Sequence, residues 1–359
     1  MTTRIACLPP LLVLLAAFVG VRAGISEPQG IHISLSPNET SPGALGVSFS
    51  SANLSDDAGV LYWQADQNAT CLFAPAKRTS YELPCIIEEN PAGCEDGQYS
   101  SPHMYHAILD TEPGLEYEYW PVMDRTSIEQ EQEKAREEGP YTTTAPPTPS
   151  RFGGDATRGA KLGVFGDLGQ TNDSIANAYG MMMADGMDMT AILNVGDLAY
   201  ADPYHKHKEG DDDEPIPPGT VLGHTRWDSY ASKHQHMFAQ IPTMNLPGNH
   251  EIENYQKKKG DDFLPFTAYA HRYPHMMNCE ACGGGGYEDE QWKANMWYSF
   301  DVGNAHIAML SDYHDFKSQV KWLDRDLAAV DRSQTPWVIV NVHAPVFNSN
   351  NAKSGKKDM

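Results

Sequence analysis

The segment that decides the fold is Thr190-Ala191-Ile192-Leu193-Asn194-Val195-Gly196-Asp197-Leu198-Ala199-Tyr200, in which an apolar strand stops at a glycine followed by a carboxylate. A shorter version of the pattern precedes it, Leu162-Gly163-Val164-Phe165-Gly166-Asp167-Leu168-Gly169. Glycine before aspartate lets the backbone turn sharply where a strand ends, so the short acidic side chain can point beyond the sheet. Both segments therefore predict a strand whose end carries a functional residue.

Two more expected strands end in polar residues. Gly248-Asn249-His250-Glu251 follows a strand near 243–246, and His343 follows a strand at 337–342. Ligands of open α/β sheets collect at the carboxyl ends of strands, so the four clusters are expected to meet in one crevice. Each fragment alone is weak, because Gly-Asp pairs also mark ordinary turns. Carboxylate, amide, imidazole and phenol groups together suit iron, zinc or manganese rather than a thiolate-loving metal.

The residues between these clusters show helical and strand patterns in alternation. Helices are expected near 173–185, 226–240 and 319–330, and further strands at 298–302 and 306–310. Strands that alternate with helices form βαβ units, so this half of the chain is predicted to be an α/β domain with a parallel or mixed sheet.

The first half of the chain has a different rhythm. Short strand-like runs at 31–35, 45–49, 105–109 and 117–120 are separated by turn-rich segments, which predicts an all-β sandwich. The segment from Leu109 to Tyr117 resembles the tyrosine corner of fibronectin type III sandwiches, in which a phenol binds nearby backbone. The alternative for Tyr117 is an aromatic side chain in a half-buried strand.

A proline- and threonine-rich stretch at 140–149, followed by Gly153-Gly154, interrupts every periodic pattern and marks a domain boundary. We predict a sandwich domain at 26–147, a linker at 148–160 and the α/β domain at 161–359. Two surface insertions are expected, at 205–219 and 279–286. Cys279 and Cys282 in the second favour a local disulfide or loop thiols over zinc, which would need another ligand pair.

The amino terminus has the pattern of a signal peptide at 1–23, with an apolar run from Leu11 to Val21 that is too short to span a membrane. A secreted, extracellular protein is therefore expected. Removal of the signal would also remove Cys7 and leave five cysteines, so one thiol would lack a partner within the chain. Four N-x-[ST] triplets agree with export as glycosylation sites, namely Asn38, Asn53, Asn68 and Asn172.

The net charge of −22 argues against nucleic acid and anionic membranes as main partners, because phosphate backbones bind positive surfaces. A small phosphate ester is not excluded, since bound metal cations dominate the local field of a site. Composition leaves a homo-oligomer open.

With its four clusters in this order, the chain from about Gly30 to its end resembles the purple acid phosphatases, a branch of the binuclear, calcineurin-like metallophosphoesterases. The resemblance implies a fibronectin type III-like front domain and a catalytic β-sandwich flanked by helices. It also implies hydrolysis of phosphate monoesters at acid pH by a metal-bound hydroxide. The implied cofactors are Fe(III) and a divalent metal, which is Zn, Mn or Fe.

The resemblance also assigns roles to individual residues. Asp167 and Tyr200 look like ligands of the ferric ion, and Asp197 looks like the carboxylate that bridges both metals. Asn249 and His343 would bind the divalent metal, and His250 resembles the family's catalytic histidine, which contacts the substrate. A phenol with a pKa near 10 ionises readily only beside a strong Lewis acid, which makes Tyr200 the residue typical of this branch.

The sequence departs from the family pattern after His343. The family's Gly-His-x-His motif should follow on a later loop, yet none of the last 16 residues (359 minus 343) is histidine. Each metal is then expected to keep three protein ligands, in a domain incomplete at its carboxyl terminus. His205, His207, His234 and His236 are not expected to replace the missing ligands, because the first pair lies in an insertion and the second on a helix at i, i+2 spacing.

Two other functions remain open at this stage. One is a nucleotide pyrophosphatase or phosphodiesterase that uses the same metal chemistry. The other is a secreted, non-catalytic binding protein in which the phosphatase domain is vestigial. Retention of Asp197 and Asn249 favours the enzyme.

Overall fold

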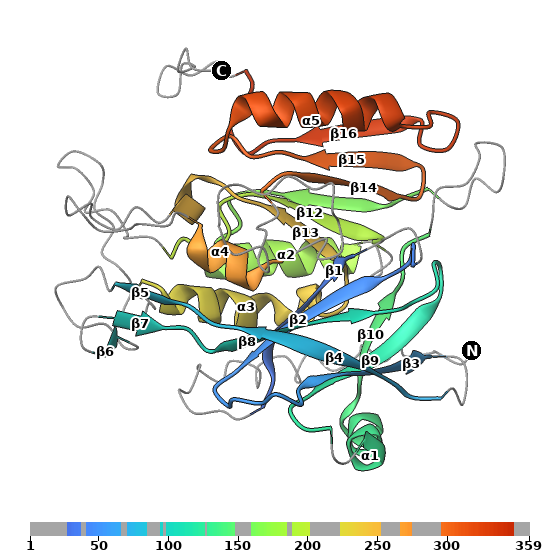
Figure 1. The fold of residues 1–359 in the computed structure, drawn as a ribbon, viewed down its shortest axis with the longest axis vertical. Coiled ribbons are helices and arrows are strands. Elements are labelled where there is room, and N and C mark those ends of the chain that lie inside the picture. Colours follow the sequence, from blue (N-terminus) through green and yellow to red (C-terminus); the bar gives the residue numbers. More distant parts are fainter. Residues whose placement is uncertain are drawn as a thin grey trace, which may run out of the picture.

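The computed structural model describes residues 27–36, 41–65, 70–84, 94–95, 98–125, 128–147, 159–184, 189–201, 223–252, 266–274 and 296–347. These residues form a β-rich first part and an α/β second part, coloured blue to green and green to red in Figure 1. The predicted signal peptide, most of the predicted linker, Asn38, Asn68, His205, His207, Cys279 and Cys282 lie outside the described residues.

The first part is an antiparallel sandwich in which one strand belongs to both sheets. The strands run in the order β1-β2-β8-β4-β3-β9-β10. Their bounds are Gln29–Leu35 (β1), Leu45–Ser51 (β2), Gly59–Gln64 (β3), Leu72–Thr79 (β4), His103–Leu109 (β8), Glu116–Val122 (β9) and Tyr141–Thr144 (β10). Residues 72–75 of β4 pair with β3 and residues 76–79 pair with β8, so β4 joins the two sheets.

Three shorter elements and one helix complete this part. Strands β5 (Glu82–Pro84), β6 (Cys94–Glu95) and β7 (Gln98–Ser100) form a small sheet, and α1 (Ile128–Glu138) lies between β9 and β10 in sequence. The amide of Glu112 donates to the Tyr117 hydroxyl at 2.9 Å, which confirms the predicted tyrosine corner. The all-β sandwich predicted for this half is confirmed.

The second part contains two three-stranded sheets among the described residues. Strands β11, β12 and β13 are parallel to one another. In the other sheet β14 is antiparallel to β15, and β15 is parallel to β16. The elements are β11 (Leu162–Phe165), α2 (Asn172–Ala184), β12 (Ala191–Val195), α3 (Thr225–Phe238), β13 (Thr243–Leu246), the 3-10 helix η2 (Asn249–Ile252), α4 (Thr267–Arg272), β14 (Tyr298–Val302), β15 (Ala305–Met309), α5 (Phe316–Ala329) and β16 (Trp337–Asn341).

The two sheets pack face to face, because Leu193 and Leu246 of the first belong to the same buried cluster as Tyr298 and Ile307 of the second. Ile192, the neighbour of Leu193 on β12, belongs instead to a cluster with Trp227 and Phe238 of α3. Alternate residues of β12 therefore contact opposite layers, as strand geometry requires. Helix α5 lies beside the second sheet (Figure 1). The predicted β-sandwich flanked by helices is confirmed.

The two parts of the molecule are joined by a buried cation. Arg272, at the end of α4, donates to Asp228 of α3 at 2.8 Å, to Tyr81 at 2.8 Å and to Tyr99 at 2.9 Å. Both tyrosines belong to the sandwich part. A buried guanidinium is tolerated only when its donors are satisfied, so this network fixes how α3 and α4 sit against the sandwich.

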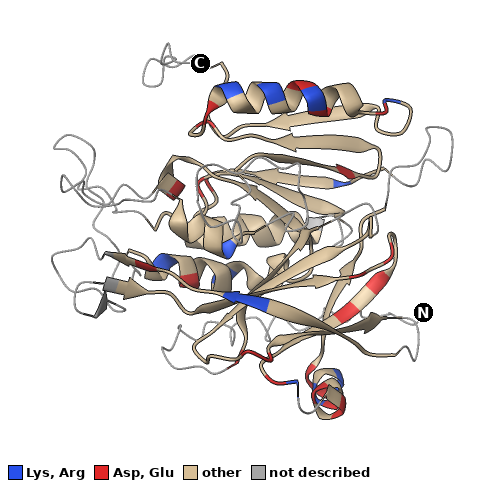
Figure 2. Ribbon diagram, viewed as in Figure 1, with Lys and Arg blue, Asp and Glu red and all other residues tan. Residues whose placement is uncertain are grey.

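Helices α1 and α5 both carry acidic and basic residues (Figure 2). Helix α1 has Glu129 and Glu131 in its first turn and Arg136 in its last turn. Within the described part of the chain, no helix is long and apolar enough to cross a membrane.

Candidate metal centre

Polar side chains that follow the strands of both sheets lie close together at the carboxyl ends of these strands. Asp167 follows β11, Asp197 and Tyr200 follow β12, and Asn249 opens η2 just after β13. Because β11, β12 and β13 are parallel, their carboxyl ends share one edge of the sheet. His343 reaches this edge from the facing sheet, two residues after β16 ends.

The loops after β11 and β12 have an unusual backbone. Asp167, Asp197 and Tyr200 adopt φ values of 54°, 54° and 51°, in the left-handed region that side chains disfavour. Such conformations cost on the order of 1–3 kcal/mol each and persist only where the surroundings impose them. Here the two loops run together, with the amide of Asp167 donating to Gly196 at 2.9 Å and that of Gly169 to Leu198 at 3.0 Å. The strain falls on three predicted ligands.

Two glycines allow the loops to approach one another closely. A Cβ on Gly196 would lie 2.6 Å from Nδ1 of His343, and one on Gly248 would lie 2.2 Å from Oδ1 of Asp197. Neither position has room for a side chain. Both glycines are therefore required for close approach, and Gly196, with φ 92°, is also required for the turn of the backbone.

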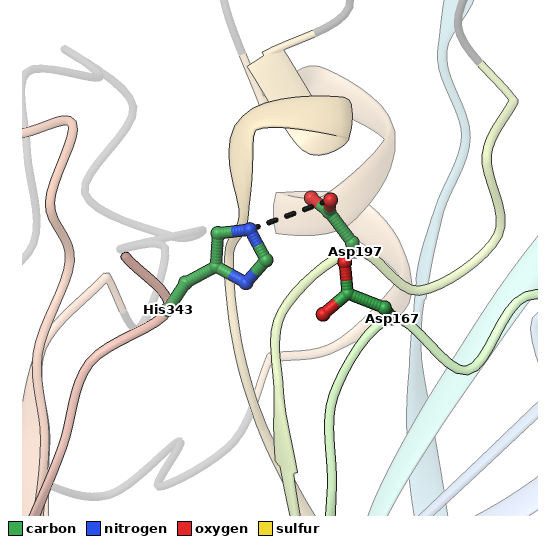
Figure 3. A group of neighbouring side chains, drawn as sticks. All are labelled: Asp167, Asp197 and His343. Atoms are coloured by element: carbon green, nitrogen blue, oxygen red, sulfur yellow. Dashed lines mark ion pairs between the residues drawn. The ribbon is translucent and has the colours of Figure 1, made fainter. Parts of the chain in front are cut away.

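Three of the predicted ligands form a compact cluster. One ligand atom from each of Asp167, Asp197 and His343 lies within 4.8 Å of the others, and Figure 3 shows His343 facing Asp197 from the opposite side. The His343 Nε2 atom lies 3.3 Å from Oδ2 of Asp197 and 3.3 Å from Oδ1 of Asn249. The Tyr200 hydroxyl donates to Asp167 at 3.2 Å. All five predicted ligands thus meet at one site.

The orientation of His343 is fixed by its other ring nitrogen. Nδ1 lies 2.9 Å from the carbonyl oxygen of Val195 and must carry the proton that it donates. Nε2 then faces the cluster, as in metal sites where the far nitrogen is held by a carbonyl. Burial lowers the pKa of His343, but the hydrogen bond and charge of Asp197 outweigh it and raise the pKa to about 9.

Tyr200 is held in its neutral form by its surroundings. Burial raises the pKa of its phenol above the usual value of 10, and the charges of Asp197 and Asp167 raise it further. Only a strong neighbouring positive charge would ionise such a phenol. The predicted requirement for a Lewis acid beside Tyr200 thus has a physical basis in this site.

His250 lies beside the cluster rather than within it. Its amide donates to Oδ1 of Asp197 at 3.0 Å, and its Nε2 lies 3.8 Å from Oδ2 of the same residue. The imidazole packs on the Tyr200 ring with centroids 4.3 Å apart. A half-buried imidazole therefore lies at the rim of the cluster.

Sequence reasoning gave no role to Glu251, which organises the loops from beneath. Its buried carboxylate accepts the amides of Asp197 at 2.8 Å, Leu198 at 2.9 Å and Gly248 at 2.8 Å. Burial, and secondarily the charge of Asp197, raises the pKa of Glu251 to about 7. One side chain therefore ties the loop after β12 to the loop after β13.

A second acidic residue that was not predicted supports His343. Oδ2 of Asp312 accepts a hydrogen bond from the amide of Ala344, the residue after His343, at 2.7 Å.

Neither supporting carboxylate has a strong signal in the sequence. The only sequence signal for Glu251 was its place in the segment with Asn249 and His250. Asp312 gave none, because its partner lies 32 residues away in the chain.

Comparison with known proteins agrees with the fold and with the metallophosphoesterase family. Residues 160–359 match the family model of the calcineurin-like phosphoesterases, which covers more than half of the chain. The chain belongs to this family.

Individual proteins with known names are also similar to the chain. It is 34% identical over 261 residues to phosphoenolpyruvate phosphatase of Allium cepa, covering 71% of this chain and 44% of that protein. It is 33% identical over 193 residues to Fe(3+)-Zn(2+) purple acid phosphatase 12 of Arabidopsis thaliana, covering 52% and 35%. Purple acid phosphatase PPD1 of Lupinus luteus has the same fold, with a TM-score of 0.57 at 17% identity, covering 88% and 50%. Within this family the chain is similar to proteins named purple acid phosphatase, and it spans less than half the length of these two curated relatives.

Proposed function

We propose that the chain is the metal-binding part of an acid phosphatase that hydrolyses phosphate monoesters. The observation that carries this proposal is the position of Asp197. One ligand atom of Asp197 lies within 4.8 Å of a ligand atom of Asp167 and of one of His343. Because a carboxylate has two oxygens, Asp197 could bind a cation through each of them. Metallophosphoesterase relatives with phosphatase names support the reaction class.

The donor atoms fit two different metals. Asp167, Tyr200 and Asp197 offer only oxygen, including a phenol, and suit Fe(III). Asp197, Asn249 and His343 offer two oxygens and one nitrogen and suit a divalent ion such as Zn, Mn or Fe. The Fe(3+)-Zn(2+) relative supports this pair. When bound, such a pair acidifies water and stabilises charge that develops on phosphoryl oxygens.

The protein residues have separate tasks in this proposal. His343 turns Nε2 inward because Nδ1 donates to Val195. Glu251 holds the Asp197 and Gly248 backbones together from below. His250, at the rim, is placed to donate a proton or hydrogen bond to the departing alcohol or the phosphate. The backbone amide of His250 donates a hydrogen bond to Asp197, which keeps this residue next to the proposed metal ligands.

The proposal is tested by loading the purified 359-residue chain with Fe(III) and Zn(II). We expect about one iron and one zinc per chain by mass spectrometry, and faster hydrolysis of p-nitrophenyl phosphate than of bis(p-nitrophenyl) phosphate. A preference for the diester would favour the phosphodiesterase alternative. A folded chain that takes up neither metal would contradict the proposal and leave the binding-protein alternative.

We also propose that the chain is exported and glycosylated, with residues 1–23 removed as a signal peptide. Asn53 and Asn172 are exposed, as glycan attachment requires, and Asn38 and Asn68 complete the proposed set. Secretion from a eukaryotic host should yield a protein whose electrophoretic mobility increases on treatment with an N-glycosidase. Unchanged mobility, or retention of residues 1–23 by amino-terminal sequencing, would contradict this.

A further inference from the structure

Helix α3 supports the loops that carry Asp167 and Tyr200 through a buried amide, the side chain of Gln170. This residue is 5% exposed and lies three positions after Asp167. Its Nε2 donates to the carbonyl of Ala199 at 3.0 Å and to that of Arg226 at 3.1 Å, and its Oε1 accepts from the Ser229 hydroxyl. Both amide protons and the oxygen are used, so the orientation of the side chain is fixed.

The carbonyl that Gln170 holds belongs to the peptide just before Tyr200. Tyr200 has a positive φ, so the direction of its phenol depends on how that peptide is held. The Nε atom of Arg226 donates to the same carbonyl oxygen at 3.2 Å. Gln170 thus links the Asp167 loop to the peptide that sets the direction of Tyr200. Arg226 and Ser229 of α3 hydrogen-bond to Gln170 or to the same peptide.

His234 of α3 holds the backbone just before Gln170. The Nε2 atom of His234 lies 2.9 Å from the carbonyl oxygen of Gly169, so Nε2 carries the proton and donates it. The side chain is fully buried, and its Nδ1 has no hydrogen-bond partner among the residues that the structure describes. Burial lowers the pKa of His234 to about 4, which keeps the ring neutral and this tautomer in place. The helical histidine that was not expected to bind metal contacts the backbone of the ligand loop.

We propose that Gln170 is a positioning residue that sets the Tyr200 phenol relative to Asp167, with His234 holding its loop in place. This inference rests on the proposed function, because the position of the phenol matters when it binds iron. Gln170 is not one of the proposed metal ligands and contacts Ala199, Arg226 and Ser229, so it would act through the peptide before Tyr200. Outer partners of metal ligands typically change metal affinity about 10–100-fold when they are lost.

The test compares two isosteric substitutions of glutamines around α3. Gln170→Met removes the amide that holds Ala199 and keeps the volume. Gln235→Met is the matched control, because Gln235 accepts from Ile31 at 3.1 Å and donates to Tyr141 at 2.9 Å, both in the sandwich part. The readouts are the phenolate-to-iron absorption band of the Fe(III)-loaded chain, the iron affinity and the thermal midpoint.

We expect Gln170→Met to move the band maximum and to lower iron affinity about 10–100-fold, whereas Gln235→Met lowers the thermal midpoint without moving the band. If Gln170→Met does not fold, His234→Phe, which keeps a ring but loses the donor to Gly169, should move the band in its place. Wild-type bands in the folded variants would overturn the inference and leave the proposed function intact. A wild-type chain that binds no iron would overturn both.

Discussion

Replacing Asp197 with asparagine is expected to reduce monoester hydrolysis by the metal-loaded chain at least ~1,000-fold, equivalent to about 4 kcal/mol of transition-state stabilisation. The residue is 3% exposed and lies in the Asp167, Asp197 and His343 cluster, where we propose that its carboxylate bridges both cations. Burial favours its neutral form, but the hydrogen bonds from His343 and from the amide of His250 hold the pKa of Asp197 below its usual value. Asparagine has the same shape but only one oxygen and no charge.

The loss should appear in metal content as well as in activity. Asp197→Asn is expected to retain less than one metal per chain after dialysis, because a neutral amide is a poor bridge between two cations. The control is Asp326→Asn, which removes a carboxylate bound by Ser299 and His306 at a distance from the site. That variant should keep its metals. Wild-type turnover and metal content in Asp197→Asn would exclude this carboxylate as the bridge.

The ligand loops could be predicted from the sequence because each depends on a local pattern. A glycine, a carboxylate or amide and the end of an apolar strand are neighbours in the chain, as at Gly196 and Asp197. The strand at 243–246 was predicted with the bounds that β13 has. The tyrosine corner likewise involves a donor and acceptor only five residues apart, Glu112 and Tyr117.

Features that depend on distant contacts could not be predicted. Strand β4 contains Pro75, which argues against a central strand, yet this proline lies next to the point where β4 changes partners from β3 to β8. Helix α1 buries only Ala135 and so has no apolar stripe to reveal it. Glu251 beside His250 looks like an ordinary polar residue until folding brings three amides to its carboxylate.

Replacing Tyr200 with phenylalanine is expected to abolish the visible absorption band of the iron-loaded chain, because that band requires a phenolate bound to Fe(III). The fold should survive, since the ring keeps its contact with His250 and loses only a hydrogen bond to Asp167. Iron affinity should fall by at least about 10-fold, because one of the three proposed ligands of the iron is removed. The measurements are the visible spectrum, iron content and thermal midpoint.

A second phenol in the same site provides the control. The Tyr313 hydroxyl lies 3.5 Å from Oδ1 of Asn249, and its ring centroid lies 6.5 Å from that of His343. Burial and the charges of Asp312, Asp197 and Glu251 raise the pKa of Tyr313 above its usual value, so it too would need a cation to ionise. If Tyr200 is the iron ligand, Tyr313→Phe keeps the band that Tyr200→Phe loses. If instead Tyr313→Phe loses the band and Tyr200→Phe keeps it, Tyr313 is the phenolate ligand. Iron would then lie beside Asn249 and His343, and its assignment to the Asp167 side would be wrong.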